Sequence, residues 1–410
     1  MDTASNQLVA RPGYTDWLRR WKNRDVIKVV TGLRRCGKST ILRLFQRELR
    51  DSGIDSSHII SINFEDLSER HPRDPQQLYD SIVSRLSPGG TNYVFLDEVQ
   101  HVEHFERAVD GLYVRDDVDL YITGSNAELL SSELATLLTG RYVELRMLPL
   151  SFAEFRAARQ TTAMGARETV ETSFERYLTY GGLPYATNLE DPQDLSDYLG
   201  GVFNTILVAD VAKRNPRMDM RAFNDVAAFL ADNIGNANSL NSIAGSLKAS
   251  GRKISPTTVS SYISAMTENY LIFRSRRYDL QGKAWLSTEE KLYLGDLGFR
   301  TWLLGKSQGD LGHRLENVVY LELLRRNASV ATGKWATKEV DFVTEGTGGT
   351  NYYQVSQSVL DPRTLERELA PLRALRDNHP KTLLTLDRIG LGDYQGIRHI
   401  NVIDWLLGKE

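Results

Sequence analysis

Short apolar segments alternate with amphipathic segments across the first third of the chain. The amphipathic segments repeat their apolar side chains at helical spacing, whereas the apolar segments have the length and composition of strands. These strand-like runs are continuously apolar, which is typical of strands buried on both faces. Strands that alternate with helices predict an α/β domain with a mostly parallel sheet. The runs lie at residues 27–31, 59–64, 93–97, 120–124 and 141–147.

The remainder of the chain shows other patterns. Helical spacing continues from Pro149 to about Arg217, and three further helical segments follow, the last with Ser255 as N-cap and Pro256 in its first turn. Two strand-like segments come next, separated by a loop that contains Gly282, and they would form a β-wing. The last part mixes helices and strands. We expect a first α/β domain at 1–150, a helical linker or lid at 151–217, a winged-helix domain at 218–300 and a second α/β domain at 301–410.

Composition places the chain among soluble globular proteins. Its 410 residues exceed what one hydrophobic core normally serves, and 41% of them are hydrophobic and 25% charged. No run approaches the ~18 apolar residues of a membrane helix, and residues 1–11 lack the apolar segment of a signal peptide. The sequence therefore predicts a cytoplasmic protein without a membrane partner. The single cysteine, Cys36, excludes an intrachain disulfide and a cysteine-based zinc site.

Charge is clustered although the net charge is only -3. Residues 11–50 contain twelve Lys or Arg against three Asp or Glu, and residues 239–284 contain seven against two. Either cluster could meet phosphate groups, and a solvated protein face explains each of them equally well. The basic residues of the second cluster that we consider for DNA contact are Arg252, Lys253, Arg274, Arg276 and Arg277.

Residues 32–39, GLRRCGKS, fit the pattern of a phosphate-binding loop, G-x-x-x-x-G-K-[ST]. The loop directly follows a strand and opens a helix, which is the context that the pattern requires. Glycines let the backbone N–H groups turn inward, and the helix N-terminus adds partial positive charge. Lys38 would reach the β- and γ-phosphates, and Ser39 would offer its hydroxyl to Mg²⁺. The residues assigned to ATP contact are Gly32, Arg35, Cys36, Gly37, Lys38, Ser39 and Thr40.

Two acidic residues follow the strand at 93–97. Ligands bind at the carboxyl ends of strands in open α/β sheets, so Asp97 and Glu98 would lie beside the phosphate loop. We expect Asp97 to hold Mg²⁺ together with Ser39, and Glu98 to orient and deprotonate the attacking water. Such a pair alone often marks a solvated strand end, but here it follows a phosphate loop by about sixty residues.

Two further residues are candidates for the chemistry. Asn126 follows the strand at 120–124 and could sense the γ-phosphate, or it could cap the helix expected at 127–138. Arg141 could reach the phosphates of a neighbouring subunit, or it could simply start a strand.

At this point the residues resemble the AAA-type ATPases of bacteria and archaea that carry a C-terminal domain of unknown function. The resemblance covers nearly the whole chain. It implies an ASCE-type first domain, in which the segment HIISINF lies between the strand of the phosphate loop and the acid-bearing strand. It also implies a winged helix followed by a restriction-endonuclease-like fold. The segments that carry it are VVTGLRRCGKST, YVFLDEVQHVEHFERAVDGLY, YITGSNAELL, TGRYVELRMLPLSFAEF, YGGLP, TVSSYISAMTENYLI, LYLGDLGFRTWLLG, LENVVYLELLRR, EVDFV and YYQVSQS.

By this resemblance the last domain would hold a magnesium-dependent nuclease site. Glu316 and Asp341 match the helix glutamate and strand aspartate of that fold. The expected E-x-K or Q-x-K triplet is Gln354 followed by Val and Ser, so the lysine that stabilises the hydroxide is missing. The site therefore looks degenerate, with Lys334 or Lys338 as conceivable substitutes.

The favoured function is an ATP-driven, Mg²⁺-dependent motor acting on DNA as a homo-oligomer, with a hexameric ring as one form and branch migration of DNA junctions as the preferred activity. Two alternatives stay open. One is a regulatory ATPase that binds a protein partner through its C-terminal half, because winged helices also bind proteins. The other is an ATP-gated nuclease. DNA-stimulated hydrolysis would favour the first function.

Overall fold

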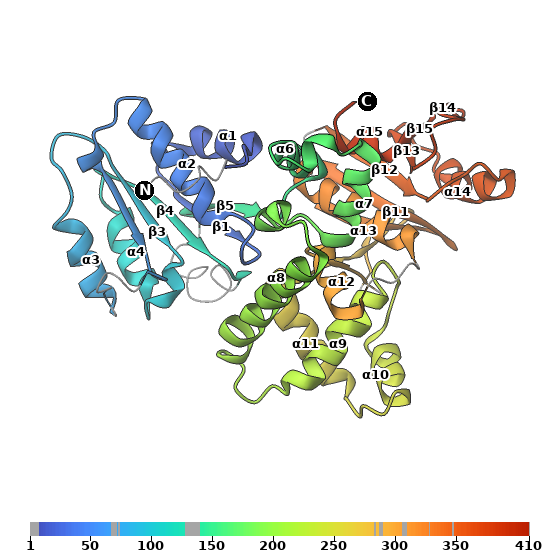
Figure 1. Ribbon diagram of the computed structural model, residues 1–410, viewed down its shortest axis with the longest axis horizontal. Coiled ribbons are helices and arrows are strands. Elements are labelled where there is room, and N and C mark those ends of the chain that lie inside the picture. The colour runs from blue at the N-terminus through green and yellow to red at the C-terminus, as the bar shows by residue number, and fades with distance from the viewer. Residues whose placement is uncertain are drawn as a thin grey trace. The chain divides into compact units, whose positions relative to one another are not determined.

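The computed structural model describes residues 8–66, 72, 74–127, 140–282, 284–286, 290–305, 310–327, 329–346 and 348–409 (Figure 1). The helix expected at 127–138 lies mostly outside these residues. The chain forms two compact units. The first consists of Met1–Met147 together with Glu268–Tyr270, and the second of Leu148–Thr267 and Leu271–Glu410.

The first unit is built on a parallel sheet, as the sequence predicts. Its three central strands are buried along most of their length, because helices cover both faces. The strand order is β2-β3-β4-β1-β5, and every neighbouring pair is parallel. The strands are β1 (Ile27–Gly32), β2 (Ile59–Asn63), β3 (Asn92–Asp97), β4 (Val118–Gly124) and β5 (Tyr142–Met147).

One expectation about this sheet is wrong. The segment HIISINF contains β2, which lies at the edge of the sheet beside β3 rather than between β1 and β3. The strand between them is β4, which pairs with β3 on one side and with β1 on the other. This order places the end of β4 next to both the phosphate loop and the acid-bearing strand.

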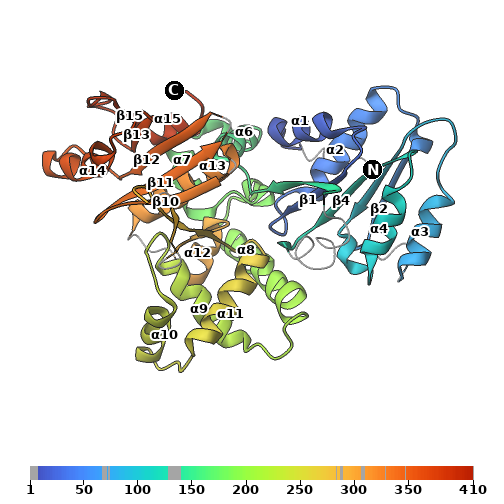
Figure 2. The same cartoon turned by 180° about the vertical axis from the view of Figure 1, so that it is seen from behind.

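Helices pack on both faces of this sheet (Figures 1 and 2). On one face α3 and α4 contribute apolar side chains such as Leu78 and Val109 to the main core. On the other face Phe45 of α2 packs against Phe95 and Tyr121 of the sheet. The helices are α1 (Pro12–Trp21), α2 (Lys38–Asp51), α3 (Pro75–Val83) and α4 (Phe105–Tyr113), with short 3-10 turns at Ser56–His58 and Val99–His101.

The second unit begins with helices. Ser151 and Glu154 form a capping box that starts α6, and Asp191 caps the helix that starts at Pro192. The helices are α6 (Phe152–Gln160), α7 (Val170–Tyr180), α8 (Pro192–Thr205), which continues as a π-helix (Ile206–Ala212), α9 (Met220–Asp232), α10 (Leu240–Ala249), α11 (Pro256–Glu268) and α12 (Leu297–Leu304), with 3-10 turns at Gly165–Arg167 and Pro184–Asn188.

The expected β-wing is only partly present. After α9, α10 and α11, the strands β6 (Ile272–Ser275) and β9 (Lys291–Leu294) pair in antiparallel fashion. The adjoining β7 (Arg277–Asp279) instead pairs with β10 (Ser329–Trp335). Part of the segment expected in the winged helix at 218–300 therefore belongs to the sheet of the last part of the chain.

That sheet has eight strands among the described residues, in the order β14-β15-β13-β12-β11-β10-β7-β8. Leu369 and Leu372 of α14 pack into a core against β11, β12 and β13. The sheet is mixed, because β10, β11 and β12 are antiparallel neighbours whereas β13 runs parallel to β12. The remaining elements are β8 (Ala284–Trp285), α13 (Leu311–Arg326), β11 (Lys338–Gly346), β12 (Gly349–Val355), α14 (Pro362–Ala374), β13 (Lys381–Thr385), β14 (Gly392–Asp393), β15 (Ile397–Asn401) and α15 (Val402–Leu406).

Helices of membrane-spanning length and hydropathy do not occur in the part of the chain that the structure describes.

Candidate active site

The phosphate loop joins β1 to α2 and has the backbone geometry of a tight turn around a ligand. Gly32 has a φ of 144°, and a Cβ atom there would lie 2.2 Å from the carbonyl oxygen of Met147. Gly37, with a φ of 107°, is the N-cap of α2, so that the helix begins at Lys38. Arg35 is exposed and also left-handed, with a φ of 65°. Larger side chains are thus excluded where the loop leaves β1.

Cys36 belongs to this loop, but its side chain is buried against the end of β5. Its Sγ atom is buried and lies 3.6 Å from the carbonyl oxygen of Met147. Burial raises the pKa of the Cys36 thiol. The assignment of Cys36 to ATP contact stays a prediction, in which the backbone of Cys36 rather than its buried side chain would face a phosphate. Arg11 donates from Nη1 to the carbonyl oxygen of Cys36 at 3.1 Å and so stabilises the loop backbone. Sequence reasoning did not identify Arg11.

Lys38 and Glu98 face each other in the site. The Nζ atom of Lys38 lies 3.3 Å from Oε1 of Glu98, and it also donates to the carbonyl oxygen of Gly32 at 3.2 Å. Both side chains are buried. Burial acts to raise the pKa of Glu98, but the ammonium group of Lys38, the amide of Gln100 and the guanidinium of Arg34 together outweigh burial, so the pKa lies below its ordinary value. Glu98 is therefore held ionised.

Asp97 is flanked by two hydroxyl groups. Thr123 donates from Oγ1 to Oδ1 of Asp97 at 2.6 Å, and the Ser39 hydroxyl lies near the same carboxylate. Burial raises the pKa of Asp97, and both hydroxyl groups oppose that shift. The structure thus brings together the two residues that the sequence assigned to magnesium. Thr123 was missed, although parallel pairing of Leu96 with Ile122 places it beside Asp97.

The orientation of Glu98 is also supported by neighbours. Its φ of 55° is left-handed, which is uncommon for a residue other than glycine and occurs often at functional sites. Its backbone N–H donates to Oγ1 of Thr123 at 2.8 Å. Gln100, which sequence reasoning missed, donates from Nε2 to Oε2 of Glu98 at 2.5 Å and approaches Oγ of Ser125 at 3.4 Å.

Asn126 follows β4 and is fully buried at the same edge of the sheet. Its Nδ2 atom donates to Oδ1 of Asn269 at 3.2 Å. Asn269 belongs to the tripeptide Glu268–Tyr270, which forms part of the first compact unit although it follows β4 by more than a hundred residues. No sequence pattern indicated this neighbour. Thr40, also assigned to ATP, lies on α2 and accepts from Arg43.

Arg141 lies at the amino-terminal ends of the strands, opposite to the ends that carry the phosphate loop. Its backbone carbonyl accepts from the N–H of Ile27 at the start of β1, whereas the phosphate loop follows the end of β1. The guanidinium group pairs with Asp110 and lies 5.4 Å from the ring centre of Tyr113. Arg141 therefore cannot act on the nucleotide of its own chain, and action on a neighbouring subunit stays a prediction.

The residues predicted to form a degenerate nuclease site lie together in the second unit. The Gln354 side chain accepts from the N–H of Asp341 at 3.4 Å, and Glu316 and Asp341 both lie near the ammonium group of Lys291. Lys291 in β9 is 3.0 Å from Glu316 and 2.8 Å from Glu339. A lysine side chain, absent from the triplet that begins at Gln354, is thus supplied to these acids by Lys291. Neither Lys334 nor Lys338 supplies it.

This acidic cluster has the properties of a buried ion-pair network. Burial raises the pKa of Asp341, and the carboxylate of Glu316 raises it further. Burial acts to lower the pKa of Lys291, but the carboxylates of Glu316, Asp341 and Glu339 raise it above its ordinary value. Among the described residues there is no group of three or more carboxylate, histidine or cysteine side chains arranged to hold a metal ion. The ammonium group of Lys291 occupies the position between the acids.

The proposed DNA-contacting residues differ in how accessible they are. Arg277 is only 11% exposed and pairs with Glu339 at 3.4 Å, so the structure gives its assignment to DNA contact no support. Arg274 is bonded to Glu290 and to hydroxyl groups of α11. Arg252 is 54% exposed and pairs with Asp225. Lys253 is exposed, and Arg276 stacks over the exposed ring of Trp285 at 4.8 Å.

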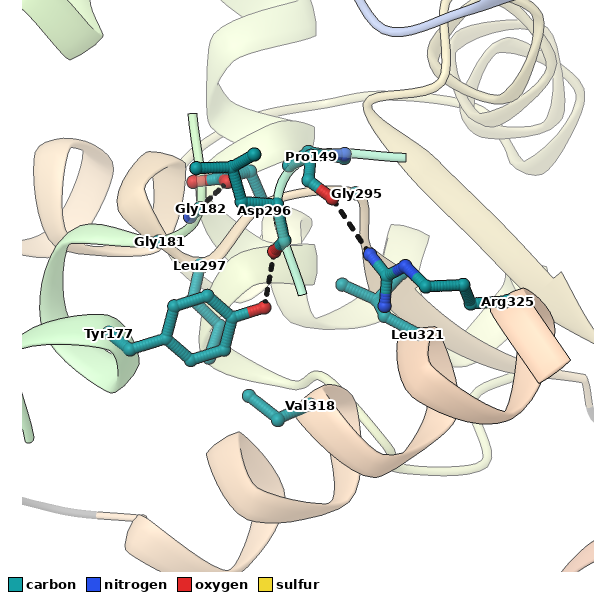
Figure 3. A pocket seen from close by; sticks show the side chains of 11 residues that line it. Pro149, Tyr177, Gly181, Gly182, Gly295, Asp296, Leu297, Val318, Leu321 and Arg325 are labelled. Carbon is teal, nitrogen blue, oxygen red and sulfur yellow. Dashed lines mark hydrogen bonds between the residues drawn. The ribbon is translucent and has the colours of Figure 1, made fainter. Parts of the chain in front are cut away.

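The buried carboxylate of Asp296 accepts hydrogen bonds from the backbone in the second unit (Figure 3). Asp296, the N-cap of α12, accepts from the N–H groups of Gly182 and Gly298 at 2.7 and 2.8 Å. A Cβ atom at Gly181 would lie 1.7 Å from this carboxylate, which explains the paired glycines of YGGLP. Burial raises the pKa of Asp296 to about 7. The adjoining cavity, with room for about one water molecule, is lined by the chain at Leu150, whose carbonyl oxygen accepts from Tyr177.

Comparisons with known proteins agree with the geometry of the first unit. Residues 24–156 match a family model described as an AAA domain, and residues 171–310 match a domain of unknown function (DUF8612). An uncharacterized protein of Haemophilus influenzae is 35% identical over 404 residues, covering 98% of this chain and 100% of that protein. An uncharacterized protein of Methanocaldococcus jannaschii is 30% identical over 393 residues, covering 90% of this chain and 83% of that protein.

Among solved structures, a Walker-type ATPase of Pyrococcus abyssi superposes with a TM-score of 0.52 at 16% sequence identity, covering 73% of this chain and 97% of that chain. This likeness shows the P-loop ATPase fold. Together with the AAA-domain match, it confirms the AAA-type part of the resemblance. The winged-helix and restriction-endonuclease-like assignments stay predictions.

Proposed function

We propose that this chain, which belongs to the same protein family as the Haemophilus influenzae and Methanocaldococcus jannaschii relatives, hydrolyses ATP to ADP and phosphate in its AAA domain. The observation that carries the proposal is the convergence of Lys38, Asp97 and Glu98 at one edge of the parallel sheet. An ordinary glycine turn between strand and helix would not need a buried lysine beside two buried acids.

The residues of this edge fit both ATP and Mg²⁺. Gly32 and Gly37 carry no side chains, so the backbone N–H groups of the loop can approach phosphates closely. Ser39 and Asp97 lie close together, and hydroxyl and carboxylate oxygens are ligands that Mg²⁺ prefers. These two residues would hold the ion, which would supply positive charge to the β- and γ-phosphates when bound.

The remaining side chains take the roles of positioning and proton transfer. Lys38 would bind oxygens of the β- and γ-phosphates, and Glu98 would accept the proton of the attacking water. As the new bond from water oxygen to the γ-phosphorus forms, the bond from that phosphorus to the bridging oxygen breaks, and ADP leaves. Gln100 and Thr123 would hold Glu98 in the orientation that this proton transfer needs.

Phosphate release from ATP by the purified full chain tests the proposal. Lys38→Ala should abolish nucleotide binding and turnover, because it removes the buried cation that faces the phosphates. Lys213→Ala, which removes an exposed lysine of the second unit, is the matched control and should leave both unchanged. Turnover that survives in purified Lys38→Ala protein would overturn the proposal.

We also propose that the ATPase acts on DNA as a homo-oligomer, with junction branch migration as the favoured activity. Three helices followed by an antiparallel strand pair support a winged helix in the second unit. Lys253 is exposed, and the stacked pair of Arg276 and Trp285 offers a cation and an aromatic face, groups that contact phosphates and bases.

The test compares ATP turnover and binding with single-stranded, duplex and branched DNA at several salt concentrations. A variant with Arg252, Lys253 and Arg276 changed to alanine should bind less tightly and lose DNA stimulation, with a smaller dependence of affinity on salt. Changing the exposed Arg363 and Arg367 of α14 is the matched control. Wild-type turnover that ignores every DNA, together with the absence of salt-sensitive binding, would exclude the DNA role.

In that case the alternative is a regulatory ATPase that binds a protein partner through its second unit. Exposed apolar side chains on two adjoining loops favour this alternative. Leu360 and Ile389 are 58% and 67% exposed, and their loops are joined by hydrogen bonds from Ser358 and Val359 to Asp387. Replacing Leu360 and Ile389 by serine should then weaken capture of the partner without lowering basal ATP turnover.

A further inference from the structure

Three consecutive residues from the middle of the chain complete the first compact unit. Glu268, Asn269 and Tyr270 group with residues up to Met147, whereas the residues directly before and after them group with the second unit. Asn269 and Tyr270 are both 3% exposed. A short segment that is buried in a different unit from its flanking residues is held there by specific contacts.

Tyr270 anchors the segment beside the strand that leads into the phosphate loop. Its backbone is left-handed, with a φ of 58°, which is strained for a tyrosine and turns the chain sharply between α11 and β6. The buried hydroxyl lies near Thr31, one residue before Gly32, and near Glu144 of β5. Thr31 in turn donates to Glu144 at 2.6 Å. The segment is thus fixed at the end of β1.

Asn269 reaches the neighbouring strand end. The hydrogen bond of 3.2 Å from Nδ2 of Asn126 to Oδ1 of Asn269 joins two fully buried amide groups. An asparagine side chain can rotate about its last bond, and a hydrogen bond to one N–H group fixes that rotation. The amide of Asn126 is therefore oriented by Asn269 at the edge of the sheet that carries Asp97 and Glu98.

We propose that Asn269 is a positioning residue for ATP hydrolysis, which orients the amide of Asn126 toward the γ-phosphate. The inference rests on the proposed ATPase function. Asn269 directly follows α11 and precedes β6 in the chain, so the residue that contacts Asn126 is continuous in sequence with both elements.

The test measures steady-state ATP turnover, ADP affinity and melting temperature for four variants. Asn269→Leu, which keeps the volume but removes the acceptor, should lower kcat about tenfold while KM and ADP affinity stay within about twofold. Asn269→Asp keeps the acceptor oxygen and should recover most of the lost rate. Asn126→Ala should lower kcat at least as much. The variant that combines Asn269→Leu with Asn126→Ala should have a kcat no lower than that of Asn126→Ala alone, because Asn269 acts through Asn126.

Asn233→Leu is the matched control, because this asparagine bonds only a helix carbonyl among its described side-chain contacts and lies in the second unit. It should keep wild-type kcat. Additive losses in the double variant, or equal damage by Asn269→Leu and Asn269→Asp, would overturn the proposal. So would a parallel fall in kcat, ADP affinity and melting temperature. Glu98→Gln in the same assay separates the two claims, since turnover unaffected by Glu98→Gln refutes the ATPase assignment itself.

Discussion

The ammonium group of Lys38 lies 3.3 Å from the carboxylate of Glu98, and the two side chains are buried together at the end of the sheet. One residue is assigned to phosphate binding and the other to water activation. Because their charges are opposite and close, Lys38 and Glu98 each stabilise the charged form of the other, whereas burial alone would favour the neutral forms.

The first prediction concerns the pH dependence of hydrolysis. Because the pKa of Glu98 lies below its ordinary value and that of Lys38 above, both groups stay charged across the neutral range. The value of kcat/KM should therefore be flat from about pH 6 to pH 8. A limb that falls as the pH drops through about 6 would contradict an ionised Glu98.

The second prediction concerns the thiol of Cys36. Since Sγ is buried behind the loop and its pKa is raised, native protein should react with maleimide far more slowly than denatured protein. Cys36→Ala should keep ATP turnover near the wild-type rate, because the nucleotide would meet only the backbone there. Ser250→Cys in the Cys36→Ala background, an exposed thiol, is the labelling control. Rapid labelling of native Cys36 would place the thiol in the site.

The sequence was sufficient to predict those site residues that lie together in short continuous segments. The phosphate loop, Asp97 and Glu98 lie in continuous segments whose flanking strands are visible as apolar runs, so both position and role could be predicted. Strand order is not local, and β4 rather than β2 therefore came to lie between β1 and β3. Asn269 reaches Asn126 from far along the chain, and no motif records that approach.

Charge alone was a poor guide in the second unit. Arg274, Arg276 and Arg277 are neighbours in a basic segment, but Arg274 lies in β6, Arg277 begins β7 and Arg276 lies between the two strands. Arg277 pairs with Glu339, whereas Arg276 meets the exposed Trp285. Lys291 was missed because it stands on β9, a strand outside the motifs that carry Glu316 and Asp341. Only the three-dimensional pairing reveals its role.

The third prediction is that Lys291 stabilises the second unit and does not support cleavage. Lys291→Met would leave buried carboxylates without their cation and should lower the free energy of unfolding by about 3 to 5 kcal/mol, measured with urea. Adding Glu316→Gln should restore part of that loss. Lys338→Met, which removes an exposed lysine from the same sheet, should cost at most about 0.5 kcal/mol. Magnesium-dependent DNA cleavage that disappears with Asp341→Ala would contradict the structural role.

The fourth prediction concerns Asp296. Its pKa is raised to about 7 from an ordinary value of 3.8, so the folded protein binds the proton more tightly than the unfolded chain does. The stability that this proton contributes is present below about pH 4 and is lost as the pH rises to about 7. Asp296→Ala, which leaves the N–H groups of Gly182 and Gly298 without their acceptor, should cost roughly 2 to 3 kcal/mol. That cost should be larger at pH 5 than at pH 8, and a cost that grows with pH would contradict the raised pKa.

The ATPase assignment itself is tested most directly by Glu98→Gln. This change keeps the size of the side chain but removes the base, so ATP should bind and persist, with phosphate release slowed at least about a hundredfold. The measurement is the ratio of ATP to ADP recovered from protein incubated with ATP and Mg²⁺, compared between wild type, Glu98→Gln and the control Glu103→Gln, which changes an exposed acid nearby. Wild type and the control should yield ADP and Glu98→Gln should yield ATP, whereas ADP formation by Glu98→Gln at the wild-type rate would contradict the assignment.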